Sequence, residues 1–289
     1  MPPVTESQAL PVVRTIAELH ERLADWRAAG ARIGFVPTMG ALHEGHLSLV
    51  DLAAKHADKV IVSIFVNPTQ FAPNEDLDAY PRTEKEDAAK LGDHPAHLIF
   101  APSAREMYPG DDDLLVEVSG PSEGLESITR PHFFGGVATV VAKLFHTVGP
   151  DVAVFGEKDY QQLQVIKKLT RDLGLPIEII AGPTGRESDG LAMSSRNAYL
   201  STDERKKAPQ LYAAITEVVR QIKDGVSIAD AREAGLAMLH DRGFDPIDYL
   251  EVRDAESLAP IDAVVRPARV LVAAKLGSTR LIDNVVLDV

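Results

Sequence analysis

The chain has 289 residues, of which 45% are hydrophobic and 25% are charged, proportions that match an ordinary globular protein and exclude a disordered or fibrous one. Its formal net charge of -13 repels a phosphate backbone over most of the surface, so nucleic acid is not an expected partner. The absence of cysteine excludes disulfides, thiolate zinc sites and cysteine nucleophiles. An anionic ligand must therefore bind at a local cluster of Lys, Arg, His and backbone N–H groups.

The sequence contains no apolar run of about 18 residues, the length that a membrane-spanning helix requires. Its N-terminal MPPVTESQALPVV also lacks a basic stretch followed by an apolar core, the pattern of a secretory signal. We therefore expect a cytoplasmic protein with no membrane partner.

Short β-rich runs alternate with helical patterns from about residue 12 to residue 180. The β-rich runs are IGFV (33–36), VIVSIFV (60–66), HLIF (97–100), VAVF (152–155) and PIEII (176–180), with helical patterns at 46–56 and 160–173. This alternation predicts βαβ units, and hence a doubly wound, Rossmann-like parallel sheet. Ligands of such sheets bind beyond the carboxyl ends of the strands, so the loops after Val36, Val66 and Phe155 are candidate binding segments.

The alternation of β-rich runs and helical patterns ends at 182–200, where GPTGRESDGLAMSSRN is predicted to be a long polar connection. Beyond it lie two helical patterns and three β-like runs, at 203–222, 227–240, 248–254, 268–276 and 279–287. We therefore predict an α/β domain over 1–184 followed by a smaller α+β domain over 185–289. The acidic segment NEDLDAYPRTEKED is consistent with a solvated loop and helix start, an interpretation that its residues alone leave open.

The segment PTMGALHEGH (37–46) directly follows the first β-rich run. His43 and His46 are three residues apart at a helix start, so both rings can face one target. Gly40 and Gly45 admit a close ligand, and the N–H groups of the following helix suit phosphate. The alternative is structural, with one ring capping the turn and the other packing on the sheet. Zinc is disfavoured because the two His of metalloprotease helices are four residues apart, whereas these are three apart. We predict no metal-ligating residue from the sequence.

GEKD (156–159) directly follows VAVF, and its lysine is the second candidate for phosphate binding. Lys158 at the end of a buried strand is poorly placed for solvation, and an anionic ligand would compensate for this. The alternative is a surface lysine that pairs with Glu157 or Asp159.

MSSR (193–196) lies within the long polar connection. Serine hydroxyls and the Arg196 guanidinium in a mobile loop can close over a triphosphate, since Arg can bond two oxygens at once. A nucleophilic serine is disfavoured because no G-x-S-x-G elbow is present. A helix-capping serine pair beside a solvated Arg is the structural alternative.

NPTQF (67–71) follows the second strong β-rich run. The amides of Asn67 and Gln70 both donate and accept, so they suit a hydroxylated acid better than a bare phosphate. A turn in which an amide caps its own backbone is the alternative.

Taken together, these segments resemble the pantothenate synthetases, or pantoate:beta-alanine ligases, within the nucleotidyltransferase-like enzymes that carry an H-x-G-H motif. The resemblance runs through nearly the whole chain and rests on PTMGALHEGH, VSIFVNPTQF, DLDAYPRT, FGEKDYQQL, DGLAMSSRNAYL, DYLEVRD and LGSTRLIDN, in that order. It implies an AMP-forming ligase of pantothenate biosynthesis, on the coenzyme A pathway. In this reaction pantoate and ATP give a pantoyl adenylate and pyrophosphate, and beta-alanine then displaces AMP. It also implies ATP as substrate, Mg²⁺ on the ATP phosphates, and a homodimer.

The resemblance further implies roles for individual residues. His46 would be the acid, acting on the phosphates together with His43, Lys158 and Arg196. The implied ATP site consists of Met39, Gly40, Ala41, Leu42, His43, Glu44, Gly45, His46, Gly156, Glu157, Lys158, Asp159, Gly185, Met193, Ser194, Ser195 and Arg196. The implied substrate-binding residues are Gln70, Gln162 and Asn67, and the C-terminal domain would act as a lid.

One segment, which we expect to be a loop over 130–136, departs from the family pattern R-P-x-H-F-x-G-V. The sequence RPHFFGGV (130–137) places Phe133 where the family has His, and His132 one position earlier.

Two other functions use similar phosphate-binding residues and stay open. A nucleotidylyltransferase would keep AMP on its product, and a non-catalytic nucleotide-binding regulator would bind ATP without turnover.

Overall fold

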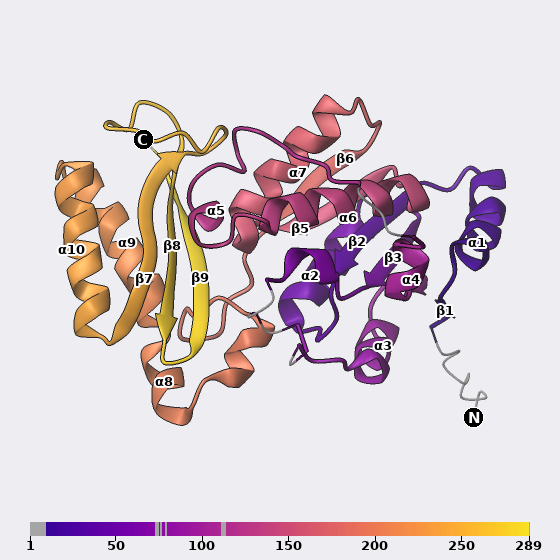
Figure 1. Cartoon of the computed structure of the whole chain (residues 1–289), viewed down its shortest axis with the longest axis horizontal. Coiled ribbons are helices and arrows are strands. Elements are labelled where there is room, and N and C mark those ends of the chain that lie inside the picture. The colour runs from indigo at the N-terminus through magenta and orange to yellow at the C-terminus, as the bar shows by residue number, and fades with distance from the viewer. Residues whose placement is uncertain (1–9, 73–74, 76, 79, 111–113, 289) are drawn as a thin grey trace, which may run out of the picture. The chain divides into compact units, whose positions relative to one another are not determined.

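The computed structural model describes residues 10–72, 75, 77–78, 80–110 and 114–288 (Figure 1). The N-terminal residues 1–9, on which the absence of a secretory signal was argued, lie outside this part of the chain. The chain divides into two compact units. Unit 1 comprises Met1–Glu117, Gly135–Phe155 and Leu169–Gly182, and unit 2 comprises Val118–Phe134, Gly156–Lys168 and Pro183–Val289.

Unit 1 is built on a six-stranded sheet with strand order β1-β4-β3-β2-β5-β6. The strands are β1 (Val12–Val13), β2 (Ile33–Thr38), β3 (Lys59–Ile64), β4 (Leu98–Phe100), β5 (Val152–Gly156) and β6 (Glu178–Gly182). The pairs β1–β4, β4–β3, β3–β2 and β2–β5 are all parallel. Every β-rich run predicted between 33 and 180 overlaps one of these strands, and the predicted α/β fold with a parallel sheet is confirmed.

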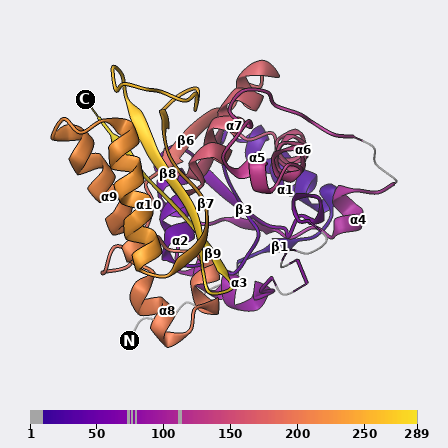
Figure 2. The ribbon, with the colours of Figure 1, turned by 60° about the vertical axis from the view of Figure 1, so that its left-hand side comes forward.

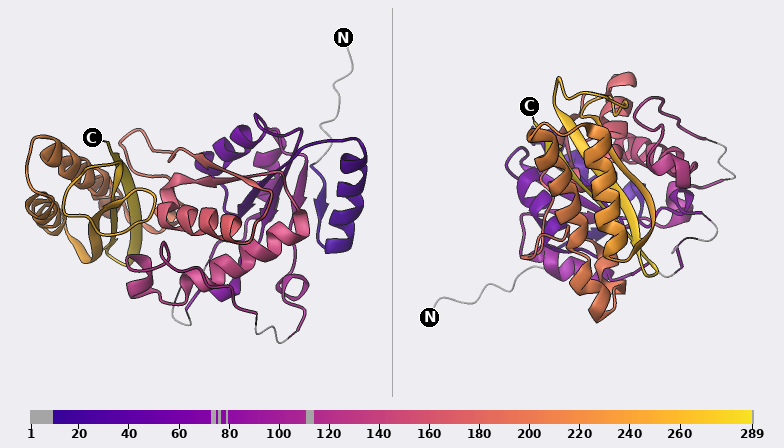
Figure 3. Two further views of the ribbon diagram at one scale, coloured as in Figure 1. Left: turned by 90° about the horizontal axis from the view of Figure 1, so that it is seen from above. Right: turned by 90° about the vertical axis from the view of Figure 1, so that its left-hand side faces the viewer.

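Helices cover both faces of this sheet (Figures 1 and 3). Buried valines of β2, β3 and β5 pack with α2 (Glu44–Ala53) and with Leu91 of α3 (Glu84–Gly92). Side chains alternate along a strand, and Phe155 of β5 contacts Phe145 of α6 (Phe133–Val148), with ring centroids 6.2 Å apart. Helix α1 (Ile16–Ala28) lies against the end of α6 through a hydrogen bond of 3.0 Å between His20 Nε2 and the Thr147 carbonyl. Burial on both faces explains why these strands read as continuous apolar runs.

Short elements follow the carboxyl ends of the parallel strands, and α7 continues from the turn after β5. They are η1 (Pro68–Gln70) after β3, α4 (Ala104–Met107) after β4, and η2 (Glu157–Asp159) and α7 (Tyr160–Asp172) after β5. The segments thus follow the strands at their carboxyl ends, where parallel sheets place their binding loops.

Unit 2 contains an antiparallel sheet of β7 (Phe244–Asp254), β8 (Ala268–Leu276) and β9 (Thr279–Leu287), in that order. Helices α9 (Gln210–Lys223) and α10 (Ile228–Asp241) lie side by side along one face of it (Figures 1 and 2). The remaining elements of unit 2 are α5 (Glu126–Thr129), η3 (Ser195–Tyr199) and α8 (Thr202–Lys207). This arrangement confirms the smaller α+β part of the predicted fold.

The single helical pattern predicted over 203–222 is wrong in one respect, because the structure has two helices there. Helix α8 ends at Lys207, and α9 begins at Gln210 with Pro209 as its N-cap residue. Proline has no N–H to donate, and its ring clashes with the carbonyl four residues earlier, so a continuous helix cannot pass through this position. In the described part of the chain, no helix combines the length and the apolar composition needed to cross a bilayer.

Candidate active site

The turn between β2 and α2 has an unusual backbone that is held by a buried carboxylate. Gly40 and Ala41 both have positive φ angles, of 86° and 51°. The left-handed region favours glycine, so Ala41 needs support from its surroundings. Asp87 of α3 supplies it, because its carboxylate accepts hydrogen bonds from the N–H groups of Ala41 (2.9 Å) and Leu42 (2.8 Å). The Asp87 side chain is buried, with 0% exposed.

The two histidines of H-x-G-H occupy the start of α2 as a reciprocal cap. His43 Nδ1 accepts a hydrogen bond from Gly45 N at 3.2 Å, and His46 Nδ1 accepts one from His43 N at 3.4 Å. Their ring centroids are 4.1 Å apart and their planes are inclined by 40°. Since Nδ1 is the acceptor in both rings, the proton of each neutral imidazole lies on Nε2. The capping role that the sequence left open is therefore present, and it directs each ring to present an Nε2–H donor.

The segment after β3 meets the turn after β2 in unit 1. Asn67 and Gln70 are both buried, and Gln70 Nε2 donates to the Met39 sulfur at 3.0 Å. Asn67 also accepts from Thr69 N at 3.3 Å, which is the amide cap proposed as the structural alternative. The structure thus brings Met39, Asn67 and Gln70 together, as expected for loops at the carboxyl edge of a parallel sheet.

In unit 2, the turn that carries Lys158 is fixed through its backbone carbonyls. Asn284 Nδ2 donates to the carbonyl oxygens of Glu157 and Lys158, each at 2.9 Å. Arg269 forms an ion pair of 3.2 Å with the Glu157 carboxylate. The Lys158 ammonium lies 3.8 Å from a carboxylate oxygen of Asp159. A pair this long and partly solvated contributes little, so an anionic ligand can compete for the ammonium.

The polar connection over 183–196 is an ordered hairpin that is anchored to β9. Arg186 donates to both carboxylate oxygens of Asp283, at 2.7 and 2.9 Å, and its guanidinium lies 3.8 Å from the ring centroid of Tyr212. Burial raises the pKa of the Asp283 carboxyl, and the Arg186 charge opposes that rise. Met193 N donates to the Gly185 carbonyl at 2.9 Å, which closes the hairpin.

Ser194 makes a helix-capping contact, the role that the sequence left open as the structural alternative for this serine. Its hydroxyl accepts a hydrogen bond of 3.3 Å from Arg196 N and so caps η3. Met193, Ser195 and Arg196 are half-buried in this hairpin, and Gln162 is half-buried on the first turn of α7. The Ser194 hydroxyl is therefore engaged with the backbone of this segment.

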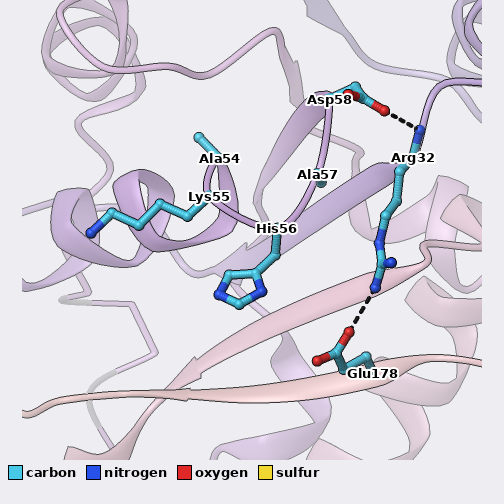
Figure 4. A pocket seen from close by; sticks show the side chains of 7 residues that line it. All are labelled: Arg32, Ala54, Lys55, His56, Ala57, Asp58 and Glu178. Atoms are coloured by element: carbon cyan, nitrogen blue, oxygen red, sulfur yellow. Dashed lines mark hydrogen bonds and ion pairs between the residues drawn. The ribbon is translucent and has the colours of Figure 1, made fainter.

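A polar hollow at the opposite edge of the unit 1 sheet is not a candidate active site (Figure 4). Arg32 and Asp58 directly precede β2 and β3, and Glu178 is the first residue of β6, so this hollow lies at the amino ends of the strands. Arg32 is already engaged, through its N–H with Asp58 (2.8 Å) and through its guanidinium with Glu178 (2.6 Å). Parallel sheets bind their ligands at the other edge.

The family model that matches the chain is described as pantoate-beta-alanine ligase and covers residues 11–286. The chain belongs to the pantoate-beta-alanine ligase family. Pantothenate synthetase of Caulobacter vibrioides is 56% identical over 276 residues, which cover 94% of this chain and 97% of that protein. The corresponding protein of Rhodospirillum rubrum is 55% identical over 279 residues, covering 96% of this chain and 99% of its own.

Solved structures of the pantoate-beta-alanine ligase family share this fold. Pantothenate synthetase from Thermus thermophilus has a TM-score of 0.89 and 47% identity, covering 96% of this chain and 99% of that one. A pantoate-beta-alanine ligase from Francisella tularensis, complexed with beta-gamma ATP and beta-alanine, has a TM-score of 0.80 and 35% identity. That similarity covers 96% of this chain and 97% of the other.

The departure from the family pattern at 130–137 begins in a turn and continues as a helix. His132 is exposed in the turn, whereas Phe133 is the first residue of α6, so the expected loop over 130–136 is wrong from Phe133 onward. The Arg130 guanidinium lies 3.9 Å from the ring centroid of Phe133. Arg130 and Phe133 are therefore joined by a cation–π contact at the start of α6.

Two of the family motifs in unit 2 form a buried charge network that the sequence analysis did not identify. Arg280 of LGSTRLIDN donates to both carboxylate oxygens of Glu126, at 2.8 and 2.9 Å, and to Asp248 of DYLEVRD at 2.7 Å. Tyr249 donates to Glu126 at 2.7 Å, and burial raises the pKa of its phenol. These motifs thus fix α5 on the three-stranded sheet.

Asp87 is the other functional residue that the sequence did not single out. It ends the acidic segment over 74–87, in which residues 74, 76 and 79 lie outside the described part of the chain. The solvated interpretation of that segment does not hold for Asp87, which is buried. A charged residue on an otherwise polar helix start gives no signal of burial, because its partners are 45 and 46 residues away.

Proposed function

We propose that this chain condenses pantoate with beta-alanine, using ATP, to give pantothenate through a pantoyl adenylate. The observation that carries the proposal is the capped histidine pair, since two Nε2–H donors at a helix N-terminus form a phosphate site. Family membership over residues 11–286 supplies the substrates. The Francisella tularensis relative, solved with beta-gamma ATP and beta-alanine, supports two of the three.

In the first step a pantoate carboxylate oxygen forms a bond to the α-phosphorus of ATP, and the bond to the bridging oxygen breaks to release pyrophosphate. Negative charge grows on the α-phosphate and on the leaving group, and donors fixed in advance stabilise it. His46 acts as the acid from Nε2, beside His43, with Lys158 and Arg196 as the cationic partners. Loss of one such donor costs about 3–4 kcal/mol in the barrier, or about a hundredfold or more in rate.

In the second step the uncharged amine of beta-alanine forms a bond to the acyl carbon, AMP leaves with the bonding electron pair, and the amine loses a proton. Gln70, Asn67 and Gln162 bind pantoate, and Gln70 also lies near beta-alanine. Water must be kept away because it would hydrolyse the adenylate. We assign this shielding to the C-terminal domain over 185–289 acting as a lid on the ATP- and pantoate-binding domain over 1–184.

The ATP-binding residues of the proposal belong to three segments. They are Met39, Gly40, Ala41, Leu42, His43, Glu44, Gly45 and His46, then Gly156, Glu157, Lys158 and Asp159, then Gly185, Met193, Ser194, Ser195 and Arg196. The ATP arrives with Mg²⁺ on its phosphates as part of the substrate. The proposal includes a cytoplasmic homodimer, in line with the resemblance to the family.

The test is pantoate-dependent exchange of labelled pyrophosphate into ATP in the absence of beta-alanine. We expect exchange by the wild type and a loss of about a hundredfold or more in the His46→Ala and Lys158→Ala variants. His56→Ala and Lys55→Ala are matched controls, because both residues are exposed at the amino edge of the sheet. Exchange that persists unchanged in His46→Ala and Lys158→Ala would remove both residues from the mechanism.

Adding beta-alanine then separates the remaining functions. A ligase releases free AMP and pantothenate, whereas a nucleotidylyltransferase retains AMP on its product. A nucleotide-binding regulator binds ATP and shows neither exchange nor AMP.

A further inference from the structure

Tyr108 lies at the carboxyl edge of the unit 1 sheet, where it follows α4 as the C-cap residue. Its phenol hydroxyl donates to Asn67 Oδ1 at 2.9 Å, across 41 residues of sequence. Asn67 itself is 1% exposed, so its amide depends on protein partners for hydrogen bonding. Tyr108 is therefore in direct contact with a residue of the proposed pantoate site.

The partners of Asn67 permit only one orientation of its amide. Its Oδ1 accepts from the Tyr108 hydroxyl, from Thr69 Oγ1 at 3.0 Å and from Thr69 N at 3.3 Å. Its Nδ2 donates to Gln70 Oε1 and to the Gly136 carbonyl, each at 3.2 Å. An exchange of Oδ1 and Nδ2 would oppose donors to donors and acceptors to acceptors, so the observed orientation is the stable one.

This orientation fixes the chemistry that Gln70 offers. Its Oε1 accepts from Asn67, so its Nε2 is the atom directed toward the turn after β2, where it meets the Met39 sulfur at 3.0 Å. A thioether is a weak acceptor, and a carboxylate or hydroxyl oxygen of an acid substrate replaces it with a stronger bond. Gln70 is thus a donor at the site.

The ring of Tyr108 is held independently of its hydroxyl. The Lys143 ammonium lies 4.9 Å from the ring centroid and donates to the Met107 carbonyl at 3.0 Å. The Phe65 ring packs beside it with a centroid distance of 6.3 Å. A change of Tyr108 to Phe therefore removes the hydroxyl while these contacts keep the ring in place.

We propose that Tyr108 is a positioning residue that acts through Asn67 to present the Gln70 amide as a donor to the acid substrate. This inference rests on the proposed function of the site, because it assumes that Gln70 binds pantoate. It adds to that function a specificity element, namely selection of an acid with an acceptor oxygen at the Gln70 position.

The test compares Tyr108→Phe, Asn67→Ala and the double variant in steady-state assays. We expect Tyr108→Phe to raise the KM for pantoate about three- to tenfold, the effect of one hydrogen bond, with kcat and the KM for ATP nearly unchanged. Because Tyr108 acts through Asn67, the Tyr108 change should add nothing further in the Asn67→Ala background. Effects that multiply in the double variant would overturn the inference.

Tyr249→Phe is the matched control, since it removes another buried phenol hydroxyl whose partner is Glu126. We expect it to lower the melting temperature without a selective change in the KM for pantoate. If Tyr249→Phe raised the KM for pantoate as selectively as Tyr108→Phe, the inference would be overturned, because the KM would then follow stability alone. A wild type inactive with pantoate overturns the proposed function and this inference together. If the wild type is active and Tyr108→Phe has the wild-type KM for pantoate, this inference alone is overturned.

Discussion

Replacement of Asp87 tests whether the turn before the histidine pair is held from α3. The Asp87 carboxylate accepts from Ala41 N and Leu42 N at 2.9 and 2.8 Å and from Thr83 Oγ1 at 3.2 Å. Asp87→Ala removes all three hydrogen bonds and leaves two backbone N–H groups without this partner. Asp87→Asn keeps the shape but opposes its NH₂ group to one of those N–H donors.

The magnitude follows from these contacts. A buried donor left without a partner costs about 1–3 kcal/mol, and a hydrogen bond to a charged group contributes about 1.5–3 kcal/mol. We therefore expect the free energy of unfolding to fall by about 3–5 kcal/mol in Asp87→Ala and by about 2 kcal/mol in Asp87→Asn. The positive φ angles of Gly40 and Ala41 lose their support, so the displaced histidines should lower the rate about ten- to a hundredfold.

Urea unfolding measures the first effect, and pyrophosphate exchange at saturating ATP measures the second. Glu86→Gln is the matched control, because Glu86 is the preceding residue of α3 and is exposed. If Asp87→Asn unfolds at the wild-type urea concentration and exchanges at the wild-type rate, the carboxylate does not hold the turn. If only stability falls, Asp87 supports the fold without positioning the histidines.

Two further changes address packing and protonation in unit 1. Gly136→Ala should raise the KM for pantoate and lower the melting temperature, because the added Cβ would lie 2.4 Å from the Thr69 carbonyl oxygen; wild-type values for both would contradict the close approach. Burial, with the Lys59 charge beside it, lowers the pKa of His97, whose Nδ1 accepts from Val60 N at 3.2 Å. The unfolded chain then takes up the proton first, so stability should fall as pH drops below about 6.5 and level off below the folded-state pKa. His97→Asn should reduce that loss in urea titrations at about pH 7.5 and about pH 5, on either side of the ordinary histidine pKa, and an equal loss in both proteins would assign it to other groups.

The sheet was predictable from the sequence because its strands are buried on both faces and so leave continuous apolar runs. The last two strands, 268–276 and 279–287, were predicted with the bounds observed. Strand β1 has only two residues, too few for a pattern, and α8 and α9 were merged because the break at Pro209 lies within one amphipathic pattern. Such local interruptions are weaker signals than the periodicity around them.

The candidate site was predictable as a set of segments, but the partners of its side chains were not. H-x-G-H, GEKD and NPTQF were identified by residue type and position after a strand. By contrast, the contacts of Asp87 with the turn and of Tyr108 with Asn67 join residues more than 40 positions apart. Such contacts form only in the folded chain, and neither residue type nor spacing predicts them.

In unit 1 the backbone and buried side chains determine which chemistry each proposed site residue presents. His43 and His46 each use Nδ1 as an acceptor for a backbone N–H, and Gln70 uses Oε1 as an acceptor for Asn67. Each residue therefore keeps an N–H donor on its other nitrogen, and none of these donors carries a formal charge while the rings are neutral. Two anionic substrates need many donors, but clustered positive charges would repel one another before the substrates bind. Neutral donors avoid that repulsion, so these three residues can add hydrogen bonds to an anionic substrate without adding positive charge before it binds.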